Sequence, residues 1–290
     1  MDNEFDINEF WEVFMAQLQE TMSHPEPELI NTHLVILLYF FFVGTCFGSL
    51  ANVMVFRLPL GKSMIRPSSY CPACEHRILV FDLVPVLSYF ILLGKCRHCK
   101  AKISIRYPIV EFLCGVLFAA CAALYAFPAM AWFSLLCFAL LTVTLIDMKV
   151  QEIPDSMVAL IAVSAIAWLA LGPESISPAE AAIGAAAGAL PLLLLDRITL
   201  LALKKDGFGY GDVKLMGAAG LFLGWQGVAA AFFIAFVSGA AAAVAMMKLS
   251  KVERGGYIAF GPFLCAGILA AAWSHALLGH HLIEFLNIGT

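Results

Sequence analysis

Basic residues are absent from both ends of this 290-residue chain: no Lys or Arg precedes residue 57, and none follows residue 254. Charge is scarce throughout, because charged residues make up 13% of the chain and hydrophobic residues 62%. In soluble globular domains, charged residues make up about 25% of the chain and apolar residues about 45–50%. The scarcity excludes an ordinary soluble domain, and we expect no nucleic-acid partner. The acidic start "MDNEFDINEFWEVF" also lacks the positive segment of a secretory signal, so we expect no cleaved leader.

Long apolar runs dominate the chain, and the run at 33–56 alone is long enough to cross a hydrocarbon core of about 30 Å. The sequence therefore predicts an all-α polytopic membrane protein, with about eight transmembrane helices. The predicted helices lie at roughly 33–56, 107–127, 130–147, 157–171, 180–203, 213–224, 226–247 and 259–279.

The placement of charge predicts the topology. With eight crossings and both termini on the non-cytoplasmic side, all 17 basic residues fall on or near the cytoplasmic side, as the positive-inside rule requires. If the short run 213–224 did not cross, the basic clusters near 204 and 250 would face opposite sides. We therefore expect an acidic non-cytoplasmic segment at 1–32, a first helix at 33–56, a cytoplasmic loop at 57–106 and a membrane-embedded region at 107–290.

The loop at 57–106 carries Cys71-x2-Cys74 and Cys96-x2-Cys99. Two such knuckles supply the four thiolates of a tetrahedral zinc site, and a site closed by four cysteines is structural because no position stays open for a substrate. Two disulfides are the alternative, but a cytoplasmic loop keeps its thiols reduced. The sequence predicts a small zinc module between the first two membrane helices.

Two acids stand at membrane borders. Asp147 ends the run 130–147, and Asp212 opens the run 213–224. The predicted topology places both at the cytoplasmic border, although they are far apart in sequence. Two carboxylates brought together share a proton, so one can activate a water while the other protonates a carbonyl or a leaving amine. The pattern favours aspartic-protease chemistry.

Several features near these acids have two interpretations. Gly209 and Gly211 would let the backbone turn sharply and a peptide approach Asp212, or they are a flexible loop before an N-capping aspartate. Asp155 follows a proline before a predicted helix and is expected to be an N-cap. Glu111, about one turn into its helix, is equally consistent with helix packing and with a role in a site.

The chain resembles the bacterial type IV prepilin peptidases, which are bifunctional leader peptidase/N-methyltransferases of the GxGD aspartyl protease class. The matching segments follow one another in order: "FGSLANVMVFRLP" (47–59), "CPAC…VPVLSYF…LGKCRHCKAKISIRYPIVE" (71–111), "LIDMKVQEIPD" (145–155), "GFGYGDVKLMGAAG" (207–220) and "FGPFLCAG" (260–267). One departure is "DLVP" (82–85), where many relatives read "NIP" or "NVP".

The resemblance implies an inner-membrane enzyme whose catalytic aspartates correspond to Asp147 and Asp212. Its substrates are prepilins or pseudopilins, which lose a short basic leader at the cytoplasmic membrane border. The new terminal residue is then methylated with S-adenosylmethionine. The tetracysteine loop looks like the zinc module of the bifunctional members, and Glu111 and Gly94 are methyltransferase candidates because they lie in the matching loop segment.

Two other functions fit parts of the pattern. A peptidase that has lost methylation would keep both aspartates and the zinc module. A transporter or assembly subunit could use the two acids as an ion site, although such folds often show inverted repeats and none is evident here. A presenilin-like protease suits the tetracysteine loop less well.

Overall fold

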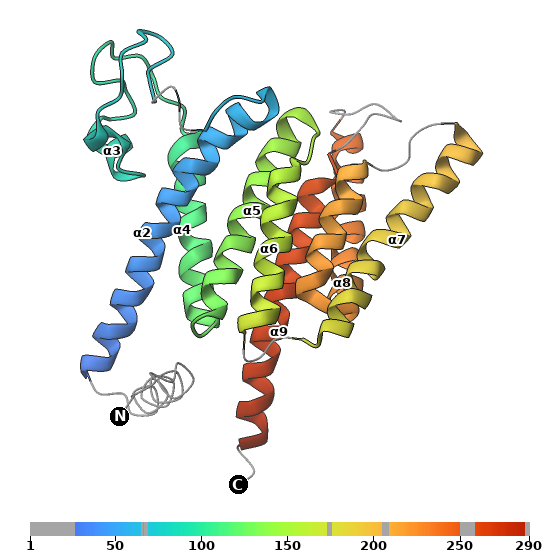
Figure 1. Cartoon of the computed structure of the whole chain (residues 1–290). Helices are drawn as coiled ribbons and strands as arrows, with labels where there is room; N and C mark the ends of the chain where they lie inside the picture. Colours follow the sequence, from blue (N-terminus) through green and yellow to red (C-terminus); the bar gives the residue numbers. More distant parts are fainter. Residues whose placement is uncertain are drawn as a thin grey trace, which may run out of the picture.

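The computed structural model describes residues 27–64, 66, 69–172, 176–204, 209–249 and 259–287, so most of the predicted acidic segment 1–32 lies outside the described residues. The described residues form helices and two isolated β-bridges, which confirms the predicted all-α class. The helices are α2 (Pro27–Arg57), α3 (Leu87–Ile91), α4 (Arg106–Leu124), α5 (Ala129–Val150), α6 (Asp155–Leu171), α7 (Pro178–Leu203), α8 (Tyr210–Lys248) and α9 (Gly261–Asn287), with 3-10 turns η1 (Leu58–Leu60) and η2 (Val80–Leu83) (Figure 1).

Five of the described helices are long and apolar enough to cross a membrane: α2, α4, α5, α7 and α8. Two shorter apolar stretches, Asp155–Leu171 and Gly261–Ser274, lie in α6 and α9. Each predicted span overlaps one of these helices, although α2 begins at Pro27, α4 already ends at Leu124 and α9 continues to Asn287.

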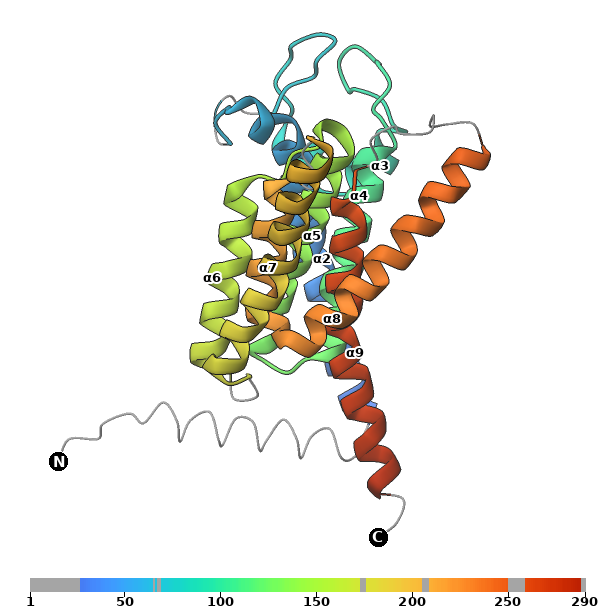
Figure 2. The same cartoon turned by 90° about the vertical axis from the view of Figure 1, so that its right-hand side faces the viewer.

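Helix α8 contains the boundary between the sixth and seventh predicted spans. Its 39 residues are interrupted at Gly224, whose φ of 63° and ψ of 179° are not helical. Residues with a Cβ rarely adopt that conformation, so a glycine suits this break. Figure 2 shows the consequence: the chain descends along the first part of α8, turns, and rises again along the second part. The predicted boundary at 224–226 thus falls at the observed break.

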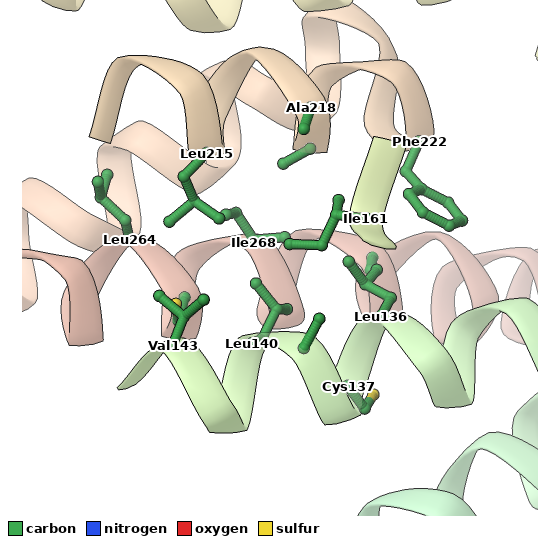
Figure 3. Close-up of a cluster of buried hydrophobic side chains, with 14 of the residues drawn as sticks. Leu136, Cys137, Leu140, Val143, Ile161, Leu215, Ala218, Phe222, Leu264 and Ile268 are labelled. Atoms are coloured by element: carbon green, nitrogen blue, oxygen red, sulfur yellow. The ribbon is translucent and has the colours of Figure 1, made fainter. Parts of the chain in front are cut away.

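The core lies between α5, α6, α8 and α9. Figure 3 shows Leu136, Leu140 and Val143 of α5 facing side chains of the other three helices. The buried hydroxyl groups of Thr142 and Ser164 each donate to the carbonyl one turn earlier, Thr142 Oγ1 to Phe138 O at 2.8 Å. Tyr125 ties α4 to α9 by donating its hydroxyl to Ala272 O at 2.9 Å. With lipid outside, such packing and internal hydrogen bonding hold the helices together.

One end of the bundle gathers the segments that carry the candidate residues. The end of α2, the start of α4, the end of α5 and the starts of α6, α8 and α9 lie there in Figures 1 and 2, together with α3 and the irregular chain around it. We call this the loop end. Asp147 near the end of α5 and Asp212 near the start of α8 are therefore at the same end of the bundle.

Candidate active site and metal centre

Asp147 lies in the last turn of α5 and is buried, with 6% of the residue exposed. Its Oδ2 accepts the backbone N–H of Gly261, the first residue of α9, at 3.1 Å. A helix N-terminus presents free N–H groups and a partial positive charge, both of which favour a carboxylate. A side chain at position 261 would place its Cβ only 2.6 Å from the same oxygen. Glycine therefore lets α9 approach and hold this carboxylate.

Asp212 lies in the first turn of α8 and faces the same cavity as Asp147. The cavity has a volume of about 460 Å³. Its lining consists of Asp147, Gln151, Glu152, Ile153, Asp155, Gly209, Tyr210, Gly211, Asp212 and Lys214. The structure thus brings together two carboxylates from helices α5 and α8 in a space that can admit water and an extended peptide.

The rim of the cavity carries further charge. Lys214 of α8 forms an ion pair with Asp155, the first residue of α6. The expectation that Asp155 caps α6 is wrong: the capping position is Pro154, without a side-chain cap bond, and the Asp155 side chain turns to Lys214 instead. Glu152 also lines the cavity. Lys214 is thus the one basic residue among the described residues that line the cavity, and the other charged lining residues are acidic.

The two glycines before Asp212 both line the cavity, and the approach of a peptide past them to Asp212 stays a prediction. Gly209 has φ −64° and ψ 134°, a conformation open to any residue, so the expected sharp turn is absent there. Gly211 lies in the helix, and a Cβ on it would come within 2.9 Å of the Ile153 Cβ. Small size at Gly211 lets α8 begin against the loop after α5.

The four cysteines lie in two loops with the same backbone hydrogen bonds. In the first, Cys71 N–H donates to His76 O at 3.0 Å, and in the second Cys96 N–H donates to Ala101 O at 2.8 Å. Glu75 and Lys100 occupy equivalent positions with positive φ, 55° and 61°. The two loops are therefore knuckles of one design, each directing its pair of sulfurs toward the other.

The ligand atoms of Cys71, Cys74, Cys96 and Cys99 all lie within 4.8 Å of one another. Cys71 Sγ and Cys99 Sγ are 3.8 Å apart. Four sulfurs placed about 2.3 Å from a central zinc are also about 3.8 Å apart, whereas a disulfide needs about 2.05 Å. The cluster fits a tetrahedral zinc, and all four cysteines are free.

One contact joins the second knuckle to η2 within the loop, and a second connects the loop to the bundle. Arg97, inside the second knuckle, makes a bidentate ion pair with Asp82 of η2, with Nη2–Oδ1 at 2.6 Å and Nε–Oδ2 at 2.9 Å. The Arg97 guanidinium holds the pKa of the Asp82 carboxyl below its ordinary value. Further along, Val86 N–H donates to Glu111 Oε2 of α4 at 2.7 Å.

Glu111 is buried in the second turn of α4, where 8% of it is exposed. Its partner Val86 has φ 62° and ψ −57°, and Leu87 N–H bonds back to Pro85 O at 2.6 Å, which defines a tight γ-turn. A β-branched residue with positive φ is strained, and such strain persists only where surrounding contacts impose it. The turn directs its N–H at Glu111.

Gly94, the other methyltransferase candidate, lies at the opposite end of α3 from Val86. Its φ is 66°, and a Cβ there would lie 2.9 Å from the Tyr89 ring. Its carbonyl accepts Ile103 N–H at 2.8 Å, so the residue begins the second knuckle. The structure therefore places Glu111 and Gly94 beside the two ends of one short helix and explains Gly94 by backbone conformation.

Three residues that contact the candidate site residues were not identified from the sequence. Gly261 lies inside the matched segment "FGPFLCAG", yet a backbone N–H leaves no mark in a sequence. Lys214 is 59 residues from Asp155, so no local pattern pairs them. The strained turn at Val86 was hidden because valine normally indicates extended chain.

Comparison with known proteins gives two family matches that together span most of the chain. Residues 42–125 match the bacterial Peptidase A24 N-terminal domain, and residues 134–244 match the type IV leader peptidase family. The first match includes the knuckles and Glu111, and the second includes Asp147 and Asp212.

Curated relatives agree with these matches. A prepilin leader peptidase/N-methyltransferase of Stutzerimonas stutzeri is 32% identical, over 89% of this chain and 98% of the relative. The enzyme of the same description from Neisseria gonorrhoeae is 34% identical over 77% and 85%, and that of Pseudomonas aeruginosa PAO1 is 32% identical over 92% and 98%. No solved structure matches the chain.

Proposed function

The chain belongs to the type IV leader peptidase family, and we propose that it removes the basic leader of prepilins or pseudopilins with Asp147 and Asp212 and then N-methylates the new terminal residue. The observation that carries the proposal is the single cavity lined by both carboxylates, at the end of the bundle that also holds the basic loop.

Cleavage by this pair needs one proton shared between two carboxyl groups. The ionised member takes a proton from water, the hydroxide attacks the carbonyl carbon of the scissile peptide, and the protonated member donates to the carbonyl oxygen. When the C–N bond breaks, the leaving amine takes a proton from the pair. The Gly261 N–H holds the Asp147 carboxylate in place during these steps.

The membrane arrangement supports this site for a helical substrate. We propose eight crossings in the cytoplasmic membrane, with α8 crossing twice by virtue of its break at Gly224 and with both termini on the non-cytoplasmic side. The loop end then faces the cytoplasm, where the positive-inside rule places the basic residues of 57–106. A prepilin helix in the same membrane would present its leader junction at the depth of Asp147 and Asp212.

We further propose that Cys71, Cys74, Cys96 and Cys99 hold one structural zinc, as their spacing and donor set fit. S-adenosylmethionine supplies the methyl group for the second reaction. The new α-amino group must lose a proton before it can accept a methyl group, and Glu111 is a buried carboxylate suited to binding an ammonium and taking that proton. Gly94 positions the chain between α3 and the second knuckle.

Co-expression with a prepilin tests the catalytic pair. Asp147→Asn and Asp212→Asn should each abolish leader removal, read as the pilin mass, while the protein still inserts into the membrane. Glu152→Gln is the matched control, because Glu152 lines the same cavity without being assigned to the pair. Mature pilin at the wild-type level with either asparagine variant would remove the pair from the mechanism.

A further inference from the structure

An apolar surface lies outside the helical bundle, on the loop between α2 and α4. Six of its large apolar side chains are each more than half exposed, with Phe81 at 84%, Ile91 at 76% and Phe90 at 64%. The six residues, which we call the α3 surface, are Val80, Phe81, Leu87, Phe90, Ile91 and Leu93. They belong to η2, to α3 and to the residue pair after α3, and η2 contacts α3. Water is an unfavourable environment for a patch of this kind.

The depth of the α3 surface is fixed by the hydrogen bond between Val86 and Glu111. Glu111 is five residues after Arg106, the first residue of α4, which corresponds to about 7–8 Å along the helix axis. Because Val86 N–H lies 2.7 Å from the Glu111 carboxylate and α3 begins at the next residue, α3 is held beside the second turn of a membrane helix. In Figures 1 and 2, α3 lies level with the start of α4, and the irregular chain around it extends farther from the bundle.

The α4 surface at that depth is itself lipid-facing. Ile109 and Phe112, on either side of Glu111, are exposed on this membrane helix, Phe112 at 53%. The α3 surface therefore continues the apolar exterior of α4 outward from the bundle. Its exposed side chains are as apolar as those that α4 presents to acyl chains.

Charge points to the same environment. Residues 57–106 contain nine basic residues and two acidic ones. Two exposed lysines adjoin the α3 surface: Lys95 is two residues after Leu93, and Lys102 forms an isolated β-bridge with Lys95. Apolar side chains combined with lysines and arginines are the pattern of segments that lie in the interface of an anionic membrane.

We propose that the α3 surface is seated in the cytoplasmic interface of the bilayer, with its apolar side chains among the first acyl carbons and the neighbouring basic residues on anionic headgroups. The ligand is the lipid surface itself. Seating α3 in lipid fixes the position of Val86, and through it the access to Glu111. The zinc knuckles then project into the cytosol from a module attached to the membrane on one side.

Site-directed photo-crosslinking in nanodiscs tests this directly with the full-length protein. p-Benzoylphenylalanine replaces Phe90 in one variant and Ile91 in a second, so that the result does not depend on one substitution being tolerated. Phe112 on α4 is the lipid-exposed positive control, and Ala73, exposed in the first knuckle, is the negative control. Lipid adducts are read by mass spectrometry after irradiation.

The expected result is a yield of lipid adducts at positions 90 and 91 close to that at 112 and several-fold above that at 73. Exchanging phosphatidylglycerol for phosphatidylcholine should lower the yield at 90 and 91 several-fold and leave the yield at 112 unchanged. Adducts at 90 and 91 no more frequent than at 73 would overturn the proposal. So would adducts formed with a co-reconstituted prepilin in place of lipid, which would make the surface a protein-docking site.

Discussion

Asp147 and Asp212 open onto a cavity, whereas Glu111, near the same end of the bundle, is covered by the backbone of Val86. The first site draws its parts from α5, α8 and α9, and the second from α4 and the loop before it. The open site has room for water and an extended peptide. The closed site has a single carboxylate under a strained turn, which suits a small group such as an amine. Peptide hydrolysis and amine methylation make these different demands.

Side-chain contacts at the end of α2 connect α5, which carries Asp147, with α4, which carries Glu111. Lys149, two residues after Asp147, places its Nζ 3.9 Å from the centre of the Phe56 ring near the end of α2. Phe56 in turn stacks on Tyr107 at the start of α4. The two chemistries should nevertheless be separable by mutation, because no assigned residue belongs to both sites.

The largest difference between the effects on methylation and on cleavage is expected from Glu111→Gln. The amide oxygen can still accept the Val86 N–H, so the turn is kept while the proton acceptor is lost. N-methylation should fall by about 10²- to 10⁴-fold, the usual contribution of a general base, and leader cleavage should stay within about twofold of wild type. Mass spectrometry of the pilin N-terminus reads both reactions. Normal methylation in this variant would restrict Glu111 to helix packing.

Gly261→Ala should produce the opposite separation. The added Cβ would lie 2.6 Å from Asp147 Oδ2, so either the carboxylate or the start of α9 must move. A displacement of about 1 Å at a catalytic group costs about 10²-fold in rate, so cleavage should fall by that order. Methylation of an already cleaved pilin should be unaffected.

Gly217→Ala is the matched control for this prediction. Gly217 is also a helical glycine, but a Cβ on it would make an ordinary contact of 3.4 Å with the Ala189 Cβ. Equal loss of cleavage in the two variants would mean that the effect of Gly261→Ala arises from bundle packing and not from the position of Asp147.

The two regions also differ in how far the sequence predicted them. The knuckles could be predicted because their cysteines are close in sequence and chemically distinctive. The cluster of four cysteines is confirmed. The helices were readable because apolar run length follows membrane thickness, and even the break at Gly224 coincided with a predicted boundary. Asp147 and Asp212 were selected by topology, since a carboxylate at a membrane border is rare.

What escaped prediction depends on contacts between distant backbone segments. The bond from Gly261 to Asp147 joins residues 114 positions apart, and the turn at Val86 is imposed by its neighbours against its own preference. Asp155 looked like a helix cap because the residues beside it allow one, while its partner Lys214 comes from another helix. Local pattern contains none of this information.

Loss of the metal should reduce methylation, which we assign to the site at Glu111, more than cleavage at Asp147 and Asp212. Cys74→Ser removes one of four ligands and should reduce zinc from about one per chain to well below that, with methylation reduced more than cleavage. Cys46→Ser is the control, because Cys46 is exposed on α2 and lies outside the cluster. Metal analysis of the purified protein measures the first effect. A full zinc content in the Cys74 variant would contradict the four-cysteine site.

The smallest effect is expected at the ion pair between Asp82 and Arg97, where this chain departs from "NIP" or "NVP". Asp82→Asn keeps one hydrogen bond to the guanidinium and removes the charge, so methylation should fall only a few-fold, as for other partly exposed pairs. Because the pKa of Asp82 is lowered in the folded protein, the pair stabilises the module above the ordinary pKa of an aspartate, about 3.9. That contribution disappears only as the pH falls through the lowered value. The ratio of methylation between wild type and the variant should therefore be constant from pH 6 to pH 8. A ratio that changes across this range would show that another group sets the attachment of the second knuckle to η2.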